Sequence, residues 1–324
     1  MKNNILYYSV GALLYCPAYK KSIADAVIHE EFGTKYSLAL CLEDTVNDRF
    51  VEEAEQILIR SIQKIHNARK NSEFYLPQIF IRVRCPQQIT KLTAALGESA
   101  EIIMGFNIPK FSVENADEYI QAIIKANESA NKKIYMMPIY ENLSIVNIQK
   151  RAEILYRLKD NLAAVEELVL GIRVGGNDLC HLFGFRRHSD ESIHRIKPVA
   201  NIFSDIVTVY GMDYVVSGPV WEYYSGENWE KGLLAEIQDD KLCGFTGKTV
   251  IHPKQIAVVN SAYQVPQSDW EDAKAILNWN QDSNAYVSGN LAKERMDEFK
   301  THANWARQTL LLAEAFGVKQ SETR

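Results

Sequence analysis

The stretch IIMGFNIPKFSVENADEYIQAIIKANESANKKIYMMPIYE, residues 102–141, contains a complete strand–helix–strand unit. Its ends, Ile102–Phe106 and Ile134–Ile139, are short apolar runs typical of strands that are buried on both faces. Between them, apolar residues recur every three or four positions within Ala116–Asn127, which predicts an amphipathic helix. This order indicates parallel pairing of the two strands, because a crossover helix carries the chain back to the starting edge of the sheet.

The same alternation extends through most of the chain. The predicted strands are Gly11–Cys16, Leu38–Leu42, Ile79–Val83, Ile102–Phe106, Ile134–Ile139, Leu168–Ile172, Tyr214–Ser217 and Thr249–His252. The other predicted helices are Asp48–Asn71, Ile148–Lys159, Ile193–Tyr210 and Trp229–Gln238. Strands and helices in strict alternation favour an α/β fold of the closed (β/α)8 type, a TIM barrel. An open doubly wound sheet is the alternative, but no G-x-G-x-x-G motif follows the first predicted strand to support a dinucleotide-binding fold.

After His252 the pattern changes to helices without intervening strands. The predicted helices of this part are Ile256–Tyr263, Asp269–Trp279 and Leu291–Phe316. The polar stretch Asn280–Asn284 is the best candidate linker within it. We therefore predict a barrel domain over residues 1–263 and a helical C-terminal extension over residues 264–324.

Composition restricts the class of protein. The 324 residues include 36 Lys and Arg against 41 Asp and Glu, and the resulting charge of −5 argues against a nucleic-acid partner. The five cysteines form no C-x-x-C pair, which is typical of reduced thiols in a cytoplasmic protein. The apolar stretch Ile5–Ala18 is interrupted by Tyr7, Tyr8 and Ser9, and we interpret it as a buried first strand rather than a signal peptide. No other apolar run approaches the ~20 residues of a membrane span, so we expect a soluble protein.

Residues suited to chemistry follow the predicted strands, where a (β/α)8 barrel places its active site. They are Glu43, Asp44, Arg82, Arg84, Lys110, Glu141, Gly176, Asp178, Pro219 and His252. Glu141 and Asp178 would supply the one or two carboxylates that Mg²⁺ needs beside water and substrate oxygens. An arginine fork matches a substrate carboxylate, so we expect a small anionic organic acid as substrate. Any one of these acids, taken alone, also fits a helix N-cap or a partner for an arginine.

Three local patterns have alternative readings. The turn at Gly175 and Gly176 would let the backbone pass close to a ligand, or would only place Asp178 at a helix N-cap. The segment Gly244–Thr249 looks like part of a phosphate-binding loop, but it continues into a strand-like run rather than a helix. Lys110 at a barrel mouth also suits a Schiff-base mechanism.

Seven motifs occur in the same order as in the citrate lyase beta-subunit-like family of C–C bond lyases, which includes malyl-CoA lyases, and the chain is identified as a member on that resemblance. The motifs are Leu13-Leu-Tyr-Cys-Pro17, Cys41-Leu-Glu-Asp-Thr-Val46, Arg82-Val-Arg84, Ile108-Pro-Lys110, Tyr140-Glu141, Gly175-Gly-Asn-Asp-Leu179 and Gly244-Phe-Thr-Gly-Lys-Thr-Val-Ile-His-Pro-Lys-Gln255. The last of these is the most specific.

The resemblance implies Mg²⁺ as cofactor, held by Glu141 and Asp178, in a retro-aldol or Claisen-type cleavage or its reverse. It implies Arg82 as the clamp on the substrate carboxylate and Glu43 and Asp44 as acids near the metal. Relatives commonly assemble as trimers, so we expect a homo-oligomer. The predicted catalytic residues are thus Arg82, Glu43, Asp44, Lys110 and Asp297, and the predicted substrate-binding residues are Arg82, Arg84, Gly176, Pro219 and His252.

The sequence departs from the family pattern at several positions. Gly11 stands where the family usually has an arginine, Cys41 replaces an aspartate, and Arg84 replaces an asparagine. The family's C-terminal aspartate, which acts across a subunit boundary, is echoed only by Asp297. These departures make CoA binding doubtful and are similar to those of the C–C bond lyases that accompany bacterial tellurite-resistance gene clusters. The additional arginine, Arg84, favours a more anionic substrate with a phosphate or a second carboxylate.

Three hypotheses follow from these observations. The leading one is a Mg²⁺-dependent carbon–carbon lyase acting on a small oxo- or hydroxy-acid. The second is a catalytically inactive barrel that serves as a ligand-binding or complex-assembly protein, since fold alone does not determine activity. The third is a metal-free Schiff-base aldolase acting through Lys110.

Overall fold

The computed structural model describes residues 3–128, 130–280 and 284–319, and its centre is one parallel sheet. The sheet strands are β1 (Ala12–Pro17), β2 (Ser37–Cys41), β3 (Gln78–Arg82), β4 (Ile103–Ile108), β5 (Tyr135–Tyr140), β6 (Ile172–Val174), β7 (Val216–Ser217) and β8 (Lys248–Val250). They follow one another in sequence order, with β8 paired to β1. A parallel bridge between Gly218 and Lys248 joins the remaining two edges. The predicted (β/α)8 barrel is confirmed, and the open sheet is excluded.

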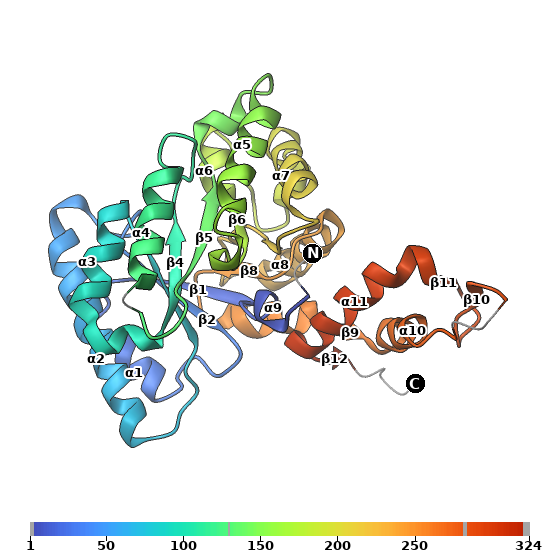
Figure 1. Cartoon of the computed structure of the whole chain (residues 1–324), viewed down its shortest axis with the longest axis horizontal. Helices are drawn as coiled ribbons and strands as arrows, with labels where there is room; N and C mark the ends of the chain where they lie inside the picture. The colour runs from blue at the N-terminus through green and yellow to red at the C-terminus, as the bar shows by residue number, and fades with distance from the viewer. Residues whose placement is uncertain (1–2, 129, 281–283, 320–324) are drawn as a thin grey trace.

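Helices connect successive strands and cover the outside of the barrel (Figure 1). They are α1 (Ile23–Ile28), α2 (Val51–Asn71), α3 (Pro86–Leu96), α4 (Ala116–Glu128), α5 (Arg151–Ala163), α6 (Gly176–Phe183), α7 (Lys197–Tyr210), α8 (Trp229–Cys243) and α9 (Lys254–Tyr263). Three of them, α1, α3 and α6, were not predicted, because two are shorter than three turns and α3 begins at Pro86 directly after a strand. No helix within the described residues has the length and apolar composition that a membrane span requires.

The predicted strand Leu168–Ile172 was wrong in its boundaries. Leu168 ends a short 3-10 helix, and the ladder of β6 begins at Ile172 and includes Arg173. The apolar run Leu168–Ile172 indicates where the chain is buried. The pairing with β5, in contrast, includes the charged residue Arg173, which a search for apolar runs leaves out.

The C-terminal part contains strands as well as helices, which corrects the prediction of helices alone. In Figure 1 it projects to one side of the barrel. Its elements are β9 (Val265–Pro266), α10 (Gln267–Leu277), β10 (Val287–Gly289), β11 (Met296–Glu298), α11 (Phe299–Phe316) and β12 (Val318–Lys319). The predicted helix Leu291–Phe316 therefore begins only at Phe299, because the Asn290 side chain accepts hydrogen bonds from the backbone of Glu294 and Arg295 and closes a β10–β11 hairpin. Of the predicted linker Asn280–Asn284, residues 281–283 lie outside the described residues.

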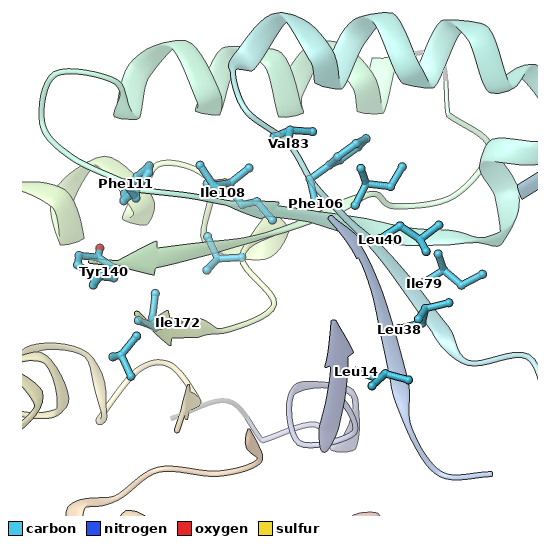
Figure 2. Packing of buried hydrophobic residues seen from close by; sticks show 14 of the residues in the cluster. Leu14, Leu38, Leu40, Ile79, Val83, Phe106, Ile108, Phe111, Tyr140 and Ile172 are labelled. Atoms are coloured by element: carbon cyan, nitrogen blue, oxygen red, sulfur yellow. The ribbon is translucent and has the colours of Figure 1, made fainter. Parts of the chain in front are cut away.

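Side chains alternate between the two faces of each barrel strand. Outward-facing residues such as Leu38, Ile79 and Phe106 belong to one buried cluster with residues of the surrounding helices. Figure 2 shows these side chains along the strands. Inward-facing apolar residues form a separate cluster inside the barrel, made of Val10, Leu13, Ala39, Phe80, Met137 and Leu170. Two residues after Phe80 the same face of β3 carries Arg82, so the interior changes from apolar to polar toward the C-terminal ends of the strands.

Candidate active site at the barrel mouth

Three carboxylates from two loops share one nitrogen of Arg82, at the end of β3. Nη2 of Arg82 lies 2.7 Å from Glu43 Oε2, 2.9 Å from Asp44 Oδ2 and 3.0 Å from Glu141 Oε1. Glu43 and Asp44 follow β2, and Glu141 directly follows β5. The parallel strands bring their C-terminal ends to the same rim, so residues almost one hundred positions apart meet there.

Lys110, after β4, binds the same carboxylates from the other side. Its Nζ lies 2.5 Å from Glu43 Oε1, 3.0 Å from Asp44 Oδ1 and 4.0 Å from Asp178 Oδ1. Its backbone N–H also donates to Glu141 Oε1 at 3.0 Å. The residue has a left-handed φ of 48°, and the side chain of Asn115 donates to its carbonyl oxygen. This turn directs both the N–H and the ammonium group toward the site.

Burial and charge set the protonation of the acids. Burial and the charge of Asp178 raise the pKa of Glu141 to about 8, although Arg82 acts in the opposite direction. Burial also raises the pKa of Glu43 above its ordinary value. Burial alone would raise the pKa of Asp44 as well, but its hydrogen bonds and the charges of Arg82 and Lys110 lower it. Among these three acids, Asp44 is therefore the one held ionised by its surroundings.

Two glycines make room for this arrangement. A Cβ on Gly175 would overlap Oε2 and Cβ of Glu141 and would lie 2.9 Å from its Cδ. A Cβ on Gly176 would lie 2.8 Å from Cβ of Pro219. Gly175 is the N-cap of α6, and Asp178 lies in the first turn of this helix. Asp178 Oδ1 also lies 4.0 Å from Nζ of Lys110, so its carboxylate faces the site.

A pocket of about 310 Å³ opens at this rim. Its lining residues are Tyr15, Asp44, Thr45, Arg82, Ile139, Glu141, Arg173, Val174, Gly175, Gly176, Asn177, Asp178, Val220, Thr249 and Ile251. This volume is at the small end of ligand-binding pockets, which suits a small acid.

The donor set of the pocket fits a hard divalent cation. Glu141 and Asp178 both line it, and both offer carboxylate oxygens. The two cationic side chains Arg82 and Lys110 lie within 4.0 Å of four carboxyl groups, those of Glu43, Asp44, Glu141 and Asp178. No cluster of three or more His, Cys, Asp or Glu side chains suited to a metal occurs in the described part of the chain. A site with two protein carboxylates, completed by water and substrate, is the kind that Mg²⁺ favours.

Some predicted residues lie elsewhere. Arg84 turns outward and pairs with Asp48 at 2.5 Å. His252 stacks on Tyr224, with ring centroids 4.6 Å apart, and does not line the pocket. Asp297 lies in the β10–β11 hairpin of the C-terminal part, away from the other predicted catalytic residues.

Two departures from the family pattern are explained by position. Gly11 precedes β1 at the end of the barrel opposite to the mouth, with a φ of 57°. A Cβ there would lie 3.4 Å from the ring of Phe316, in α11, so the place of the family's arginine is next to this helix. Cys41 is fully buried and ends β2 directly before the acids.

Sequence reasoning missed the polar residues deeper in the pocket. Arg173 on β6, Tyr15 on β1 and Thr249 on β8 all line it. Nη2 of Arg173 donates to Oγ1 of Thr249 at 2.6 Å. The sequence did contain one signal that could have identified this part of the pocket. Arg173 is a charged residue next to an apolar run, which is unusual for a strand with both faces buried.

A family model described as C–C bond lyase of the TIM-barrel fold matches residues 4–318. A (3S)-malyl-CoA thioesterase from Cereibacter sphaeroides is 26% identical over 155 residues, which are 48% of this chain and 52% of that protein. The chain thus matches about half the length of these curated relatives.

Two solved structures share the architecture. A citrate lyase from Burkholderia xenovorans superposes with a TM-score of 0.72 at 14% identity, covering 97% of this chain and 94% of that one. The protein CitE from Mycobacterium tuberculosis, in complex with magnesium, acetoacetate and coenzyme A, superposes with a TM-score of 0.61 at 18% identity, covering 95% and 99%. At such identities the likeness concerns the fold. Since the family model matches nearly every residue of the barrel and of the C-terminal part, the chain belongs to the family of C–C bond lyases of the TIM-barrel fold.

Proposed function

We propose that this protein is a Mg²⁺-dependent carbon–carbon lyase that cleaves a small oxo- or hydroxy-acid, or condenses its products. The observation that carries the proposal is that Glu141, Asp178 and Arg82 line one small pocket, with Lys110 Nζ 4.0 Å from Asp178. The related M. tuberculosis protein was crystallised with magnesium, acetoacetate and coenzyme A, which supports an acid and a metal as ligands.

In this proposal Glu141 and Asp178 would hold the cation, which would supply a Lewis acid for the oxygens of the bound acid. Arg82 and the Lys110 backbone hold the Glu141 carboxylate in place. Asp44 lines the pocket and is held ionised, which suits the acceptor of a substrate hydroxyl proton. The ammonium of Lys110 places a fixed positive charge beside the pocket, where it would stabilise negative charge that develops during cleavage.

Titration calorimetry with Mg²⁺ and pyruvate tests the binding part of the proposal. We expect each ligand to strengthen binding of the other, and we expect Glu141→Ala and Asp178→Ala to abolish this coupling. Glu98→Ala is the control, because Glu98 is highly exposed and lies outside this pocket. Undiminished coupling in both site variants would contradict the metal site.

A panel of substrates tests turnover. It contains malate, citramalate, citrate and their CoA thioesters, with release of oxo acid and of free thiol measured separately. The curated relative is a thioesterase, so thiol release without carbon–carbon cleavage would indicate thioester hydrolysis rather than lyase activity. Clear ligand binding without any turnover would favour the ligand-binding or complex-assembly hypothesis over the lyase.

We also propose that residues 264–324 form an extension through which copies of the chain assemble. Leu291 and Met296 in this part have 78% and 55% of their surface exposed, which supports contact with another molecule. Light scattering coupled to size exclusion should give a mass above that of one chain, with a trimer favoured by analogy with relatives. A monomer at micromolar concentration would contradict this.

A further inference from the structure

One buried arginine in the barrel has no acidic partner within the part of the chain that the structure describes. Arg173 has only 2% of its surface exposed. The other buried arginines of the described chain, Arg82, Arg151 and Arg187, each form an ion pair with at least one carboxylate. Arg173 forms no such pair with any described residue, and its Nη1 is buried without a hydrogen-bond partner.

An unpaired guanidinium is costly to bury, because the charge loses its hydration without a compensating anion. Burial accordingly lowers the pKa of Arg173 below its ordinary value. The carboxylates of the mouth do not reach it, since those of Glu43, Asp44 and Glu141 are held by Arg82. The positive charge of Arg173 is thus left for a group that enters the pocket.

The neighbours of Arg173 are hydrogen-bond donors. Oγ1 of Thr249 accepts from Arg173 and keeps its own hydrogen to donate. The Tyr15 hydroxyl is hydrogen-bonded to Arg173 and accepts from Nδ2 of Asn107 at 3.0 Å, so its hydrogen is also available. Arg173, Tyr15 and Thr249 line the pocket together, and a cluster of one cation and two hydroxyl donors is suited to an anion.

We infer that Arg173, Tyr15 and Thr249 bind a second anionic group of the substrate, a carboxylate or a phosphoryl group at the end opposite to its oxo-acid end. The inference rests on the proposed function, because the oxo-acid end is assigned to Glu141 and Asp178 in the same pocket. The substrate is therefore a small dianionic or more highly charged oxo acid. Arg173, rather than the outward-facing Arg84, is the arginine that selects for the extra charge.

The test compares three ligands with the same oxo-acid end and different far ends. They are 2-oxobutyrate, with a methyl group, oxaloacetate, with a carboxylate, and 3-phosphonopyruvate, with a phosphonate. Dissociation constants are measured by calorimetry on the full chain in saturating Mg²⁺. We expect oxaloacetate or 3-phosphonopyruvate to bind at least about tenfold more tightly than 2-oxobutyrate, and the tighter of the two identifies the second group.

The variant Arg173→Met keeps the volume and removes the charge. We expect it to abolish the preference for the doubly anionic ligand and to leave binding of 2-oxobutyrate within about twofold of the wild type. Arg173→Lys should restore part of the preference, because it keeps the charge without the fork. Arg157→Met, at an exposed site on α5, is the matched control and should change nothing.

Several outcomes would overturn the inference. Equal binding of all three ligands by the wild-type protein would overturn the inference without the need for a variant, and would leave the proposed metal site intact. The inference would also be overturned, and the metal site left intact, if Arg173→Met lost affinity for all three ligands by the same factor. Failure of every oxo acid to bind in Mg²⁺ would overturn the proposed function and this inference with it.

Discussion

Arg82 Nη2 lies 3.0 Å from Glu141 Oε1, and this pair joins the ends of β3 and β5 across the interior of the barrel. The Glu141 side chain is 1% exposed and that of Arg82 is 11% exposed, so water contributes little to the solvation of either charge. At this depth each residue stabilises the charged form of the other, although burial still raises the pKa of Glu141 to about 8. The pair ties the predicted metal ligand to a side chain from another strand.

Removing Arg82 should destabilise the fold. The substitution Arg82→Gln leaves Glu43 and Glu141 buried without their shared cation, and we expect the free energy of unfolding to fall by about 3 kcal/mol. Urea unfolding at pH 7 measures this. Arg84→Gln, two residues further along the chain, is the control. The partner of Arg84, Asp48, is 88% exposed, so the free energy of unfolding of Arg84→Gln should fall by no more than about 1 kcal/mol. Equal losses for the two variants would contradict the view that the Arg82 network is a buried ion-pair network.

The variant Gly175→Ala should damage the metal site more than the fold. The new methyl group overlaps the Glu141 carboxylate and must displace it, so we expect Mg²⁺ affinity to fall by more than about tenfold. Unfolding free energy should fall by roughly 1–3 kcal/mol from the same crowding. Gly289→Ala is the matched control, because nothing lies within 4 Å of a Cβ at that position. Calorimetry measures the Mg²⁺ affinity of both variants. An unchanged affinity in Gly175→Ala would show that Glu141, with its side chain placed as in this structure, does not hold the metal.

Lys110 should not form a Schiff base. Burial alone would lower the pKa of its ammonium, but the hydrogen bonds to Glu43 and Asp44 raise it above its ordinary value. A nucleophilic lysine must be uncharged, and these two carboxylates hold Lys110 in the charged form. We therefore expect no mass increase after borohydride reduction in the presence of pyruvate at pH 7.5. A peptide carrying the reduced adduct on Lys110 would support the metal-free aldolase instead.

Stability should decrease in alkaline solution through His194. Burial alone would lower the pKa of His194, but its hydrogen bonds to Asp240 and Cys243 raise it to about 9. Lys248, fully buried, faces the other oxygen of Asp240 at 2.7 Å. Because the folded pKa lies above the unfolded value of ~6.5, the stabilisation is complete below pH 6.5 and is lost as pH rises through 9. The contribution of protonated His194 to the free energy of unfolding is at most about 3 kcal/mol.

Urea unfolding of the wild type and His194→Gln at pH 6, 7.5 and 9.5 tests this. The variant should be clearly less stable at pH 6, and the difference should narrow by pH 9.5. A difference that is the same at all three values would mean that the charge of His194 contributes nothing.

The barrel could be predicted because each strand carries its own local signal. The runs around Leu38–Leu40 and Ile79–Ile81 are apolar on both faces, and turns or helices separate them at regular spacing. Boundaries were less accurate where burial and pairing differ, as at Leu168. The C-terminal hairpin was missed because the residues Met296–Glu298 have no apolar alternation, and the turn depends on one side chain, Asn290.

Some of the predicted site residues could be placed from the sequence, whereas others could not. Glu43, Asp44, Lys110 and Glu141 follow strands directly, so the fold alone brings them to the rim. Arg84 has the same parity as Arg82, so alternation along a strand would place both on the inward face. Arg84 lies beyond the end of β3, however, and turns outward to pair with Asp48. Arg173 could not be found from apolar periodicity, which treats a charged residue as the end of a strand.

The amino-acid sequence by itself determined the order of strands and helices, and hence the family and the set of acids and bases at one rim, because these follow from local hydrophobic patterns and short motifs. Only the tertiary structure decided which of those groups are paired and which are left without a partner. Arg82 and Arg173 are alike in sequence, each a charge near the end of an apolar strand. Arg82 meets three carboxylates, whereas Arg173 meets none among the described residues, and that difference depends on strands separated by long stretches of chain.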